Sequence, residues 1–299
     1  MPRTILFAGA SGLIGRRLVE TCRAASDAVR VLTRTTPRSD NEFAWDPARE
    51  ALDPRALDGV DTVVCLSGAG IADKRWTRSR KRELIQSRVD AVRTLANAIA
   101  SAATPRTFVC ASATGYYGDR TDEWLDETSP RGKGFLAELC EAWESAADPA
   151  RSAGARVAHL RFGVVLTREG GALAKMLPLF RAGLGGPLGN GRQYMPWISL
   201  VDAVAAARFV VEREPLSGPF NVVSPHAVTN REFTRTLARS INRRAVLPAP
   251  AFVLRLSLGE IAAELLLAGQ RVRPAKLENA GFSFRQARLE EHFAAELGR

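Results

Sequence analysis

Short, continuous apolar runs alternate with stretches in which apolar residues recur at helical spacing over the first 165 residues. The runs predict strands that are buried on both faces, at 4–8, 29–33, 42–45, 61–66, 107–112 and 156–163. The helical spacing predicts helices at 13–25, in a long stretch that Thr77 caps, and at 135–147. This alternation predicts an α/β fold with a doubly wound parallel sheet.

The pattern changes after Gly163. Five glycines between 183 and 191 predict a mobile loop, before a helix at 203–212 and a last strand at 220–223. Thr229 and Glu232 have the spacing of a capping box, and Gly281 fits the position after a helix end. We therefore expect two domains, one at 1–165 plus 200–224 and a smaller, mostly helical one at 166–199 plus 225–299.

The first strand runs into a turn with glycines at every third position. Gly9 permits a tight turn, Gly12 lets the backbone approach a pyrophosphate, and Gly15 lets the helix pack close to the strand. The phosphates of a dinucleotide would lie at the helix N-terminus, where N–H groups and the dipole favour negative charge. The predicted contacts are Gly9, Ser11, Gly12, Leu13, Ile14 and Gly15; the alternative is a glycine-rich turn of another α/β protein.

Residues at the carboxyl ends of the other strands extend this site, since ligands of open α/β sheets bind there. Thr33 and Arg34 end strand two, where an acidic residue would suit NAD and an Arg suits the phosphate of NADP; otherwise Arg34 is a surface residue. Ser112 is a candidate to hydrogen-bond a substrate, or else a turn serine that bonds to backbone. The further predicted cofactor contacts at strand ends are Asp46, Ser67, Gly68, Ala69 and Ala111.

Composition limits the choice of partner. The chain has 299 residues, 46% hydrophobic and 25% charged, which is ordinary for a soluble protein of one or two domains. Its net charge is +10, with eight Arg or Lys residues between 74 and 93. This basic stretch is a solvated helix face or an anion site; nucleic acid is disfavoured because Trp76 alone offers a stacking ring.

The cysteines and histidines show no metal-ligand spacing, so no metal is expected. Cys65 and Cys110 lie inside apolar strand patterns and read as core residues in a reducing cytoplasm. We expect no signal peptide, and the most apolar later stretch is interrupted by charges. We expect a cytoplasmic protein with a small-molecule substrate and no membrane partner; the oligomeric state stays open.

Taken together, these motifs resemble the short-chain dehydrogenase/reductase superfamily in its extended form, and most closely the atypical branch labelled "epimerase family protein". The resemblance covers nearly the whole chain, in blocks at 9–15, 71–77, 112–118, 161–166, 170–173, 193–198, 259–260, 265–272 and 280–282. It implies that the domain at 1–165 plus 200–224 is a dinucleotide-binding Rossmann domain that binds NADP(H), and that the smaller domain at 166–199 plus 225–299 is a substrate domain. It also implies cofactor contacts at Arg88, where extended members have Asn, and at Arg161.

Extended members use a Tyr-x-x-x-Lys pair, in which the Lys lowers the pKa of the proton-transferring Tyr. Here the corresponding helix carries Phe135 and Leu139. The candidate catalytic residues are therefore Ser112, Tyr116 and Tyr117, and the glycine loop would form a lid with substrate contacts at Arg192, Gln193, Met195 and Trp197. The predicted function is an oxidoreductase or epimerase-like enzyme of unknown substrate. The alternative is a cofactor-binding sensor or interaction protein without turnover.

Overall fold

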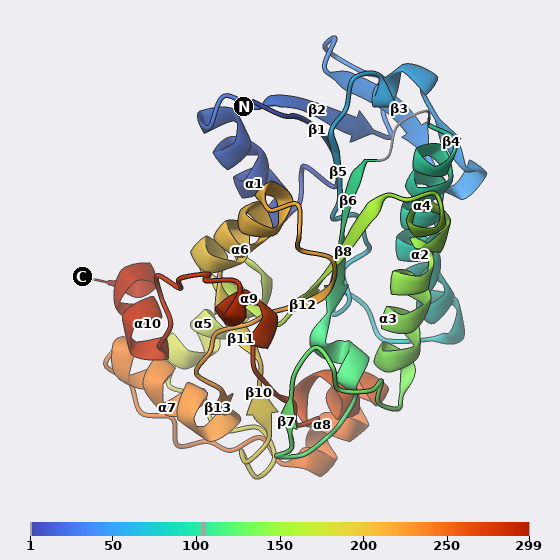
Figure 1. Cartoon of the computed structure of the whole chain (residues 1–299). Coiled ribbons are helices and arrows are strands. Elements are labelled where there is room, and N and C mark those ends of the chain that lie inside the picture. Colours follow the sequence, from blue (N-terminus) through green and yellow to red (C-terminus); the bar gives the residue numbers. More distant parts are fainter. Residues whose placement is uncertain (1, 103–105, 299) are drawn as a thin grey trace. The chain divides into compact units, whose positions relative to one another are not determined.

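The protein, shown as a computed structural model in Figure 1, divides into two units. The structure describes residues 2–102 and 106–298. The first unit comprises Met1–Ser112, Leu139–Leu160 and Val204–Pro219, and the second comprises Ala113–Glu138, Arg161–Ala203 and Phe220–Arg299. Residues 113–138, which the sequence analysis gave to the cofactor domain, thus group with the second unit.

An eight-stranded sheet contains all the strands that the apolar runs predicted. Its strand order is β12-β8-β6-β5-β1-β2-β3-β4. Strand β1 pairs in parallel with β2 and β5, β2 with β3, and β5 with β6, whereas β4 is antiparallel to β3. The doubly wound parallel sheet is therefore confirmed. The strands are β1 (Thr4–Ala8), β2 (Ala28–Thr33), β3 (Glu42–Asp46), β4 (Ala51–Leu52), β5 (Thr62–Cys65), β6 (Thr107–Ala113), β8 (Arg156–Phe162) and β12 (Gly218–Val222).

The helices that follow these strands also agree closely with the sequence pattern. Thr77 caps α2 by accepting a hydrogen bond from the backbone N–H of Arg80 at 3.2 Å, as predicted. The predicted helix at 135–147 ends earlier, because Asp148 and Pro149 begin a separate short helix. The elements are α1 (Leu13–Ala24), η1 (Pro47–Arg49), η2 (Pro54–Leu57), α2 (Arg78–Ala100), α3 (Phe135–Ser145), α4 (Asp148–Ser152) and α6 (Leu200–Glu212).

The second unit is mainly helical beyond residue 225, as expected, but it also holds three small two-stranded sheets. They pair β10 (Tyr194–Met195) with β13 (Val228–Thr229), β11 (Trp197–Ser199) with β9 (Val164–Thr167), and β14 (Arg271–Val272) with β7 (Trp124–Leu125). Strands of two to four residues are too short to show a periodic pattern, so the sequence analysis missed them. The remaining elements are η3 (Thr114–Tyr117), α5 (Gly171–Arg181), α7 (Asn230–Ser240), α8 (Ala251–Leu258), η4 (Ala262–Leu266), α9 (Ala275–Asn279) and α10 (Leu289–Leu297).

Two local predictions for the second unit are confirmed. Thr229 and Glu232 form the capping box of α7, with the Glu232 carboxylate 2.7 Å from the Thr229 backbone N–H. Gly281 lies just beyond α9 with φ of +80°, a conformation that glycine adopts without steric cost.

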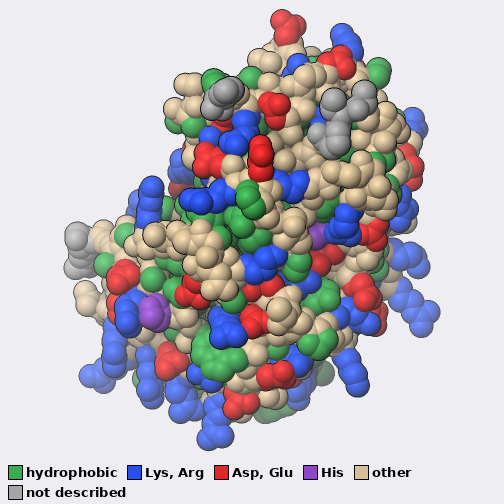
Figure 2. Space-filling view, viewed as in Figure 1, with side chains coloured by type: hydrophobic (Ala, Val, Ile, Leu, Met, Phe, Trp, Pro, Cys, Tyr) green, Lys and Arg blue, Asp and Glu red, His purple; other side chains and the backbone are tan. Residues whose placement is uncertain are grey.

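On the face that Figure 2 shows, Lys and Arg side chains are widely spread among Asp and Glu.

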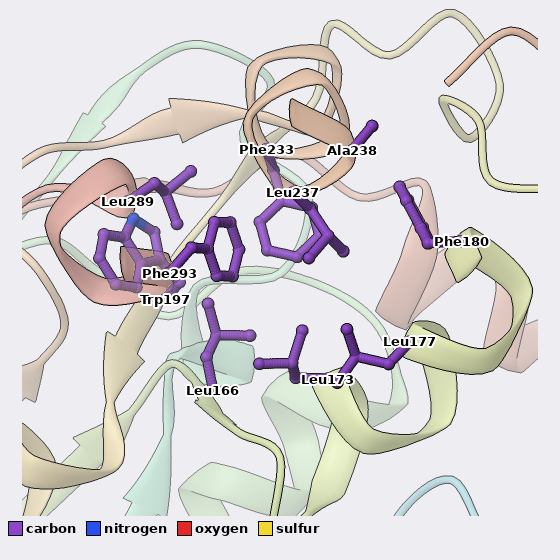
Figure 3. Close-up of a cluster of buried hydrophobic side chains, with 10 residues drawn as sticks. All are labelled: Leu166, Leu173, Leu177, Phe180, Trp197, Phe233, Leu237, Ala238, Leu289 and Phe293. Carbon is purple, nitrogen blue, oxygen red and sulfur yellow. The ribbon is translucent and has the colours of Figure 1, made fainter. Parts of the chain in front are cut away.

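Apolar side chains from three helices surround Trp197 in the core of the second unit (Figure 3). Leu173 and Leu177 come from α5, and Phe233 comes from α7. The ring of Phe293, from α10, meets that of Phe233 edge to face with centroids 5.7 Å apart. These contacts hold the helices of the C-terminal region around β9 and β11.

Candidate functional site

The turn between β1 and α1 explains its glycines one by one. Gly9 has φ of +86°, and a Cβ there would lie 2.7 Å from the carbonyl carbon of Leu66. A Cβ on Gly15 would lie 2.1 Å from the carbonyl oxygen of Gly9. A Cβ on Gly12, by contrast, meets only that same oxygen, at 3.4 Å. Gly9 and Gly15 are therefore required by the fold, whereas Gly12 keeps space open on the exposed side of the turn.

Gly12 is also the N-cap of α1, and no side chain caps this helix end. The first N–H groups of a helix have no partner inside it, and together with the dipole they favour an anion. Leu13 and Ile14 occupy the first turn and are half-buried, while Ser11 is exposed. The open space beside Gly12 and the uncapped helix end fit a pyrophosphate.

The end of β2 offers a cation and hydroxyl groups rather than a carboxylate. Arg34 directly follows the strand and is exposed. The hydroxyl oxygens of Thr33 and Thr35 are 2.9 Å apart. Asp46, at the end of β3, accepts a hydrogen bond from the backbone of Ala48 at 3.1 Å and so caps η1. That contact gives Asp46 a structural role, and its predicted cofactor contact stays a prediction.

Arg88, on α2, packs against the loop that follows β5. It is buried, and its Nη2 donates to the carbonyl of Ala69 at 2.9 Å while Nη1 donates to that of Leu84 at 3.0 Å. A Cβ on Gly68 would lie 3.2 Å from the Arg88 side chain, and the guanidinium carbon is 5.1 Å from the Trp143 ring centroid. Burial lowers the pKa of Arg88 to about 10. Arg88 thus positions the backbone of the loop after Ser67.

The basic stretch before and within α2 is only partly a solvated face. Arg80 is buried and donates to the carbonyl of Gly70, while it also pairs with Glu83 at 2.7 Å. Trp76 is buried as well, and its indole N–H donates to the carbonyl of Ile71 at 2.8 Å. The Trp76 ring, which the sequence offered for stacking on nucleic acid, is therefore part of the core, and its N–H is bonded within the protein.

Ser112 lies next to Ala111, one residue before the end of β6, and both side chains are buried. The Ser112 hydroxyl donates to the Glu144 carboxylate of α3 at 2.7 Å. This partner is a side chain, so the alternative of a turn serine that bonds to backbone does not describe it. A hydroxyl has one proton to donate, so with Glu144 as its acceptor Ser112 offers lone pairs to any further partner.

The two candidate tyrosines of the second unit differ sharply. Tyr117 is fully buried; its hydroxyl donates to Asn221 Oδ1 at 2.7 Å and accepts from Arg161 Nη1 at 3.1 Å. Burial raises the pKa of Tyr117 to about 12. Tyr116 is only half-buried, and the guanidinium carbon of Arg161 lies 3.5 Å from its ring centroid. Arg161, predicted as a cofactor contact, is here engaged with both tyrosines.

Sequence reasoning missed two charged residues beside this network. Glu127 is buried and accepts from the backbone N–H of Asn221 at 2.9 Å, and burial raises the pKa of its carboxyl. Lys276 has its amine 4.2 Å from the ring centroid of Phe220, and burial lowers its pKa. Neither residue belongs to a motif or to a periodic pattern, so only the folded contacts reveal them.

The predicted substrate residues differ in their exposure and in their contacts. Gln193 donates its amide to the carbonyls of Leu188 and Leu266 at 3.1 and 2.9 Å, whereas Arg192 is exposed. Met195 packs against the cluster of Figure 3. Trp197 is only 1% exposed, so the expectation that it offers a face to a ligand is wrong: its ring fills that core.

Part of the glycine loop is held by backbone hydrogen bonds. The N–H of Gly189 donates to the carbonyl of Ala249 at 2.8 Å, and the N–H of Arg231 donates to that of Gly191 at 2.9 Å. Closure of this loop as a lid stays a prediction.

Over the two described ranges, no group of three or more His, Cys, Asp or Glu could hold a metal ion. Within the same ranges, every helix is too short or too polar to span a bilayer.

A glycine turn between the first strand and first helix of a doubly wound parallel sheet defines the class of Rossmann-fold proteins. The model of the NAD dependent epimerase/dehydratase family matches residues 5–223, and a domain of unknown function (DUF1731) matches residues 249–296. The chain belongs to the NAD dependent epimerase/dehydratase family.

Relatives cover almost the full chain. An epimerase family protein of Mycobacterium bovis is 46% identical over 280 residues, which are 94% of this chain and 93% of the relative. Human epimerase family protein SDR39U1 is 34% identical over 285 residues, 94% of each chain. A crystal structure of human SDR39U1 (isoform 2) with NADPH matches with a TM-score of 0.87 and 32% identity over 98% of both chains. The resemblance drawn from the motifs is thereby confirmed.

Proposed function

We propose that this chain is an NADP(H)-binding, atypical short-chain dehydrogenase/reductase, acting as an oxidoreductase or epimerase-like enzyme on a small molecule without a Tyr-x-x-x-Lys pair. The observation that carries the proposal is the β1–α1 turn, in which Gly12 alone keeps space open above an uncapped helix end. The NADPH in the crystal structure of human SDR39U1 supports the same cofactor.

Different residues of the first unit would bind different parts of this cofactor. The backbone N–H groups after Gly12 suit the pyrophosphate, and Arg34 suits the 2′-phosphate, which a guanidinium can bind bidentately. When bound, the nicotinamide supplies hydride transfer. Arg88 would act indirectly, since its hydrogen bonds hold the loop after β5 in place.

Titration of NADPH and NADH into wild type and Arg34→Ala tests the cofactor assignment. A charge-assisted hydrogen bond is worth about 1.5–3 kcal/mol, so Arg34 should favour NADPH by about 10- to 150-fold. The preference should shrink in high salt, because Arg34 is exposed. Arg23→Ala, which removes another exposed arginine of the first unit in the last turn of α1, is the matched control. Equal wild-type affinities, or an unchanged preference in Arg34→Ala, would make Arg34 a plain surface residue.

For catalysis we favour Ser112 and Tyr116 over Tyr117. Because the Ser112 proton goes to Glu144, Ser112 would accept a hydrogen bond from a substrate hydroxyl rather than polarise a carbonyl. The Tyr117 proton is committed to Asn221, and its pKa of about 12 opposes acid-base work near neutral pH. Once turnover is found, Tyr116→Phe should lower the rate by about 10²–10⁴-fold. Full activity in that variant would move the acid-base role elsewhere.

A sensor or interaction protein without turnover is the second candidate. The side chains at the Tyr and Lys positions, Phe135 and Leu139, are both buried apolar groups. NADPH consumption in a metabolite screen separates the two candidates, since a sensor binds the cofactor without oxidising it.

We also propose a reducing, cytoplasmic location, which the four buried thiols support.

A further inference from the structure

Helix α8, Ala251–Leu258, is apolar at six of its eight positions, yet none of its residues is buried. Phe252 is 71% exposed and Leu256, one helical turn later, is 80% exposed. Residues four apart lie on the same face of a helix, so these two side chains form one protruding apolar ridge. Exposed apolar surface of this kind indicates a contact that covers it.

Neighbouring segments of the second unit extend this ridge. Val246 and Leu247, which precede α8, are 65% and 50% exposed. The glycine loop lies against them, because a Cβ on Gly186 would be 1.7 Å from the carbonyl oxygen of Leu247. Leu184, on the same loop, is also exposed. Two segments distant in sequence thus bring their apolar side chains to one surface.

The two segments that form this surface carry charges of a single sign. Residues 170–201 and 233–259 contain no Asp or Glu. The side chain of Arg243 donates to the carbonyl of Arg181 at 3.0 Å, which joins the two segments. We call the whole set the apolar–arginine surface; it consists of Leu184, Val246, Leu247, Phe252 and Leu256 together with the exposed Arg181, Arg243, Arg244 and Arg255.

We propose that the apolar–arginine surface docks on bilayers that contain anionic phospholipids. Phe252 and Leu256 would enter the boundary between headgroups and acyl chains, and the arginines would meet the lipid phosphates. Such docking requires no membrane-spanning helix. A symmetric contact with a second copy would instead bring the same arginines together, and like charges across an interface are unfavourable.

Co-sedimentation with vesicles tests this proposal, and it needs no cofactor. One set of vesicles is phosphatidylcholine, and the other is phosphatidylcholine mixed with phosphatidylglycerol. Wild type should partition onto the mixed vesicles and lose that binding as salt is added. Phe252→Ser combined with Leu256→Ser should weaken binding by about tenfold or more, and Arg255→Gln by about fivefold. Both helix positions are exposed, so the fold should survive.

Matched controls lie elsewhere on the chain. Val201 of α6 is another exposed aliphatic residue, and Arg49 is an arginine of the first unit; Val201→Ser and Arg49→Gln should leave binding unchanged. Absence of wild-type binding to the mixed vesicles would overturn the proposal. Binding that Phe252→Ser with Leu256→Ser does not weaken would overturn it too, as would self-association or capture of an acidic protein with no vesicle binding.

Discussion

Two turns follow parallel strands of the same sheet, and they are built in opposite ways. The turn after β1 is defined by its own backbone, since Gly9 and Gly15 each lie where a Cβ would collide with main-chain atoms. The turn after β6 carries Tyr117, whose hydroxyl is bonded to Asn221, 104 residues further along the chain. A site made from local backbone can be recognised in a sequence, whereas a site made from distant side chains appears only on folding.

The largest expected effect tests the first turn. Gly12→Val should reduce NADPH affinity by about 100-fold or more, because a side chain there would fill the approach of the pyrophosphate and cost at least two charge-assisted hydrogen bonds. Stability should change little, since a Cβ at Gly12 meets only one atom, at 3.4 Å. Calorimetric titration together with urea unfolding measures both quantities.

Gly15→Ala is the contrasting control for that experiment. Its Cβ would lie 2.1 Å from the carbonyl oxygen of Gly9, so it should lose about 1–3 kcal/mol of stability or more through overpacking. If Gly12→Val binds NADPH as wild type does while folded, the pyrophosphate lies elsewhere. If Gly12 and Gly15 variants lose stability equally, the two glycines do not have separate roles.

The second turn is tested by removing one hydroxyl. Tyr117→Phe leaves Asn221 without its donor and Arg161 without one acceptor, so the free energy of unfolding should fall by about 1–3 kcal/mol. Tyr116→Phe is the neighbouring control and should change stability much less, since that side chain is only half-buried. Urea unfolding of both variants is the measurement. Equal stabilities would show that the Tyr117 network contributes nothing to the fold.

How much the sequence could predict follows the same division. The strands of the sheet other than β4, the Thr77 cap and the Thr229 capping box were predicted because each depends on residues close together in the chain. Trp197 was misassigned because an aromatic residue after a glycine loop resembles a ligand platform, while its burial depends on helices up to 100 residues away. Glu144, the partner of Ser112, gave no sequence signal for the same reason.

The smallest expected effect compares two carboxylates whose pKa values are both lowered in the fold. Asp126 accepts hydrogen bonds from Thr128 and from Arg273, the residue that follows β14. These contacts lower the pKa of Asp126 to about 2 from 3.8. Asp53, in the first unit, has its pKa lowered by Arg55, only two residues away. Arg273 is 147 residues from Asp126, so unfolding separates that pair. The contact of Asp126 with Thr128 is local, as is that of Asp53 with Arg55, and such residues stay near each other in the unfolded chain. The two carboxylates therefore differ in the distant Arg273 alone.

A lowered pKa in the folded state stabilises the protein above the unfolded pKa and is lost as pH falls through the folded value. Between pH 3.8 and about 2, wild type should therefore lose about 1 kcal/mol that Asp126→Asn does not lose, a modest figure because Asp126 is partly exposed. Asp53→Asn should follow wild type over this range, because its charged partner persists on unfolding. Urea unfolding across that range gives the slopes. If Asp53→Asn flattened the curve as much as Asp126→Asn, sequence separation would not distinguish the interactions of the two units.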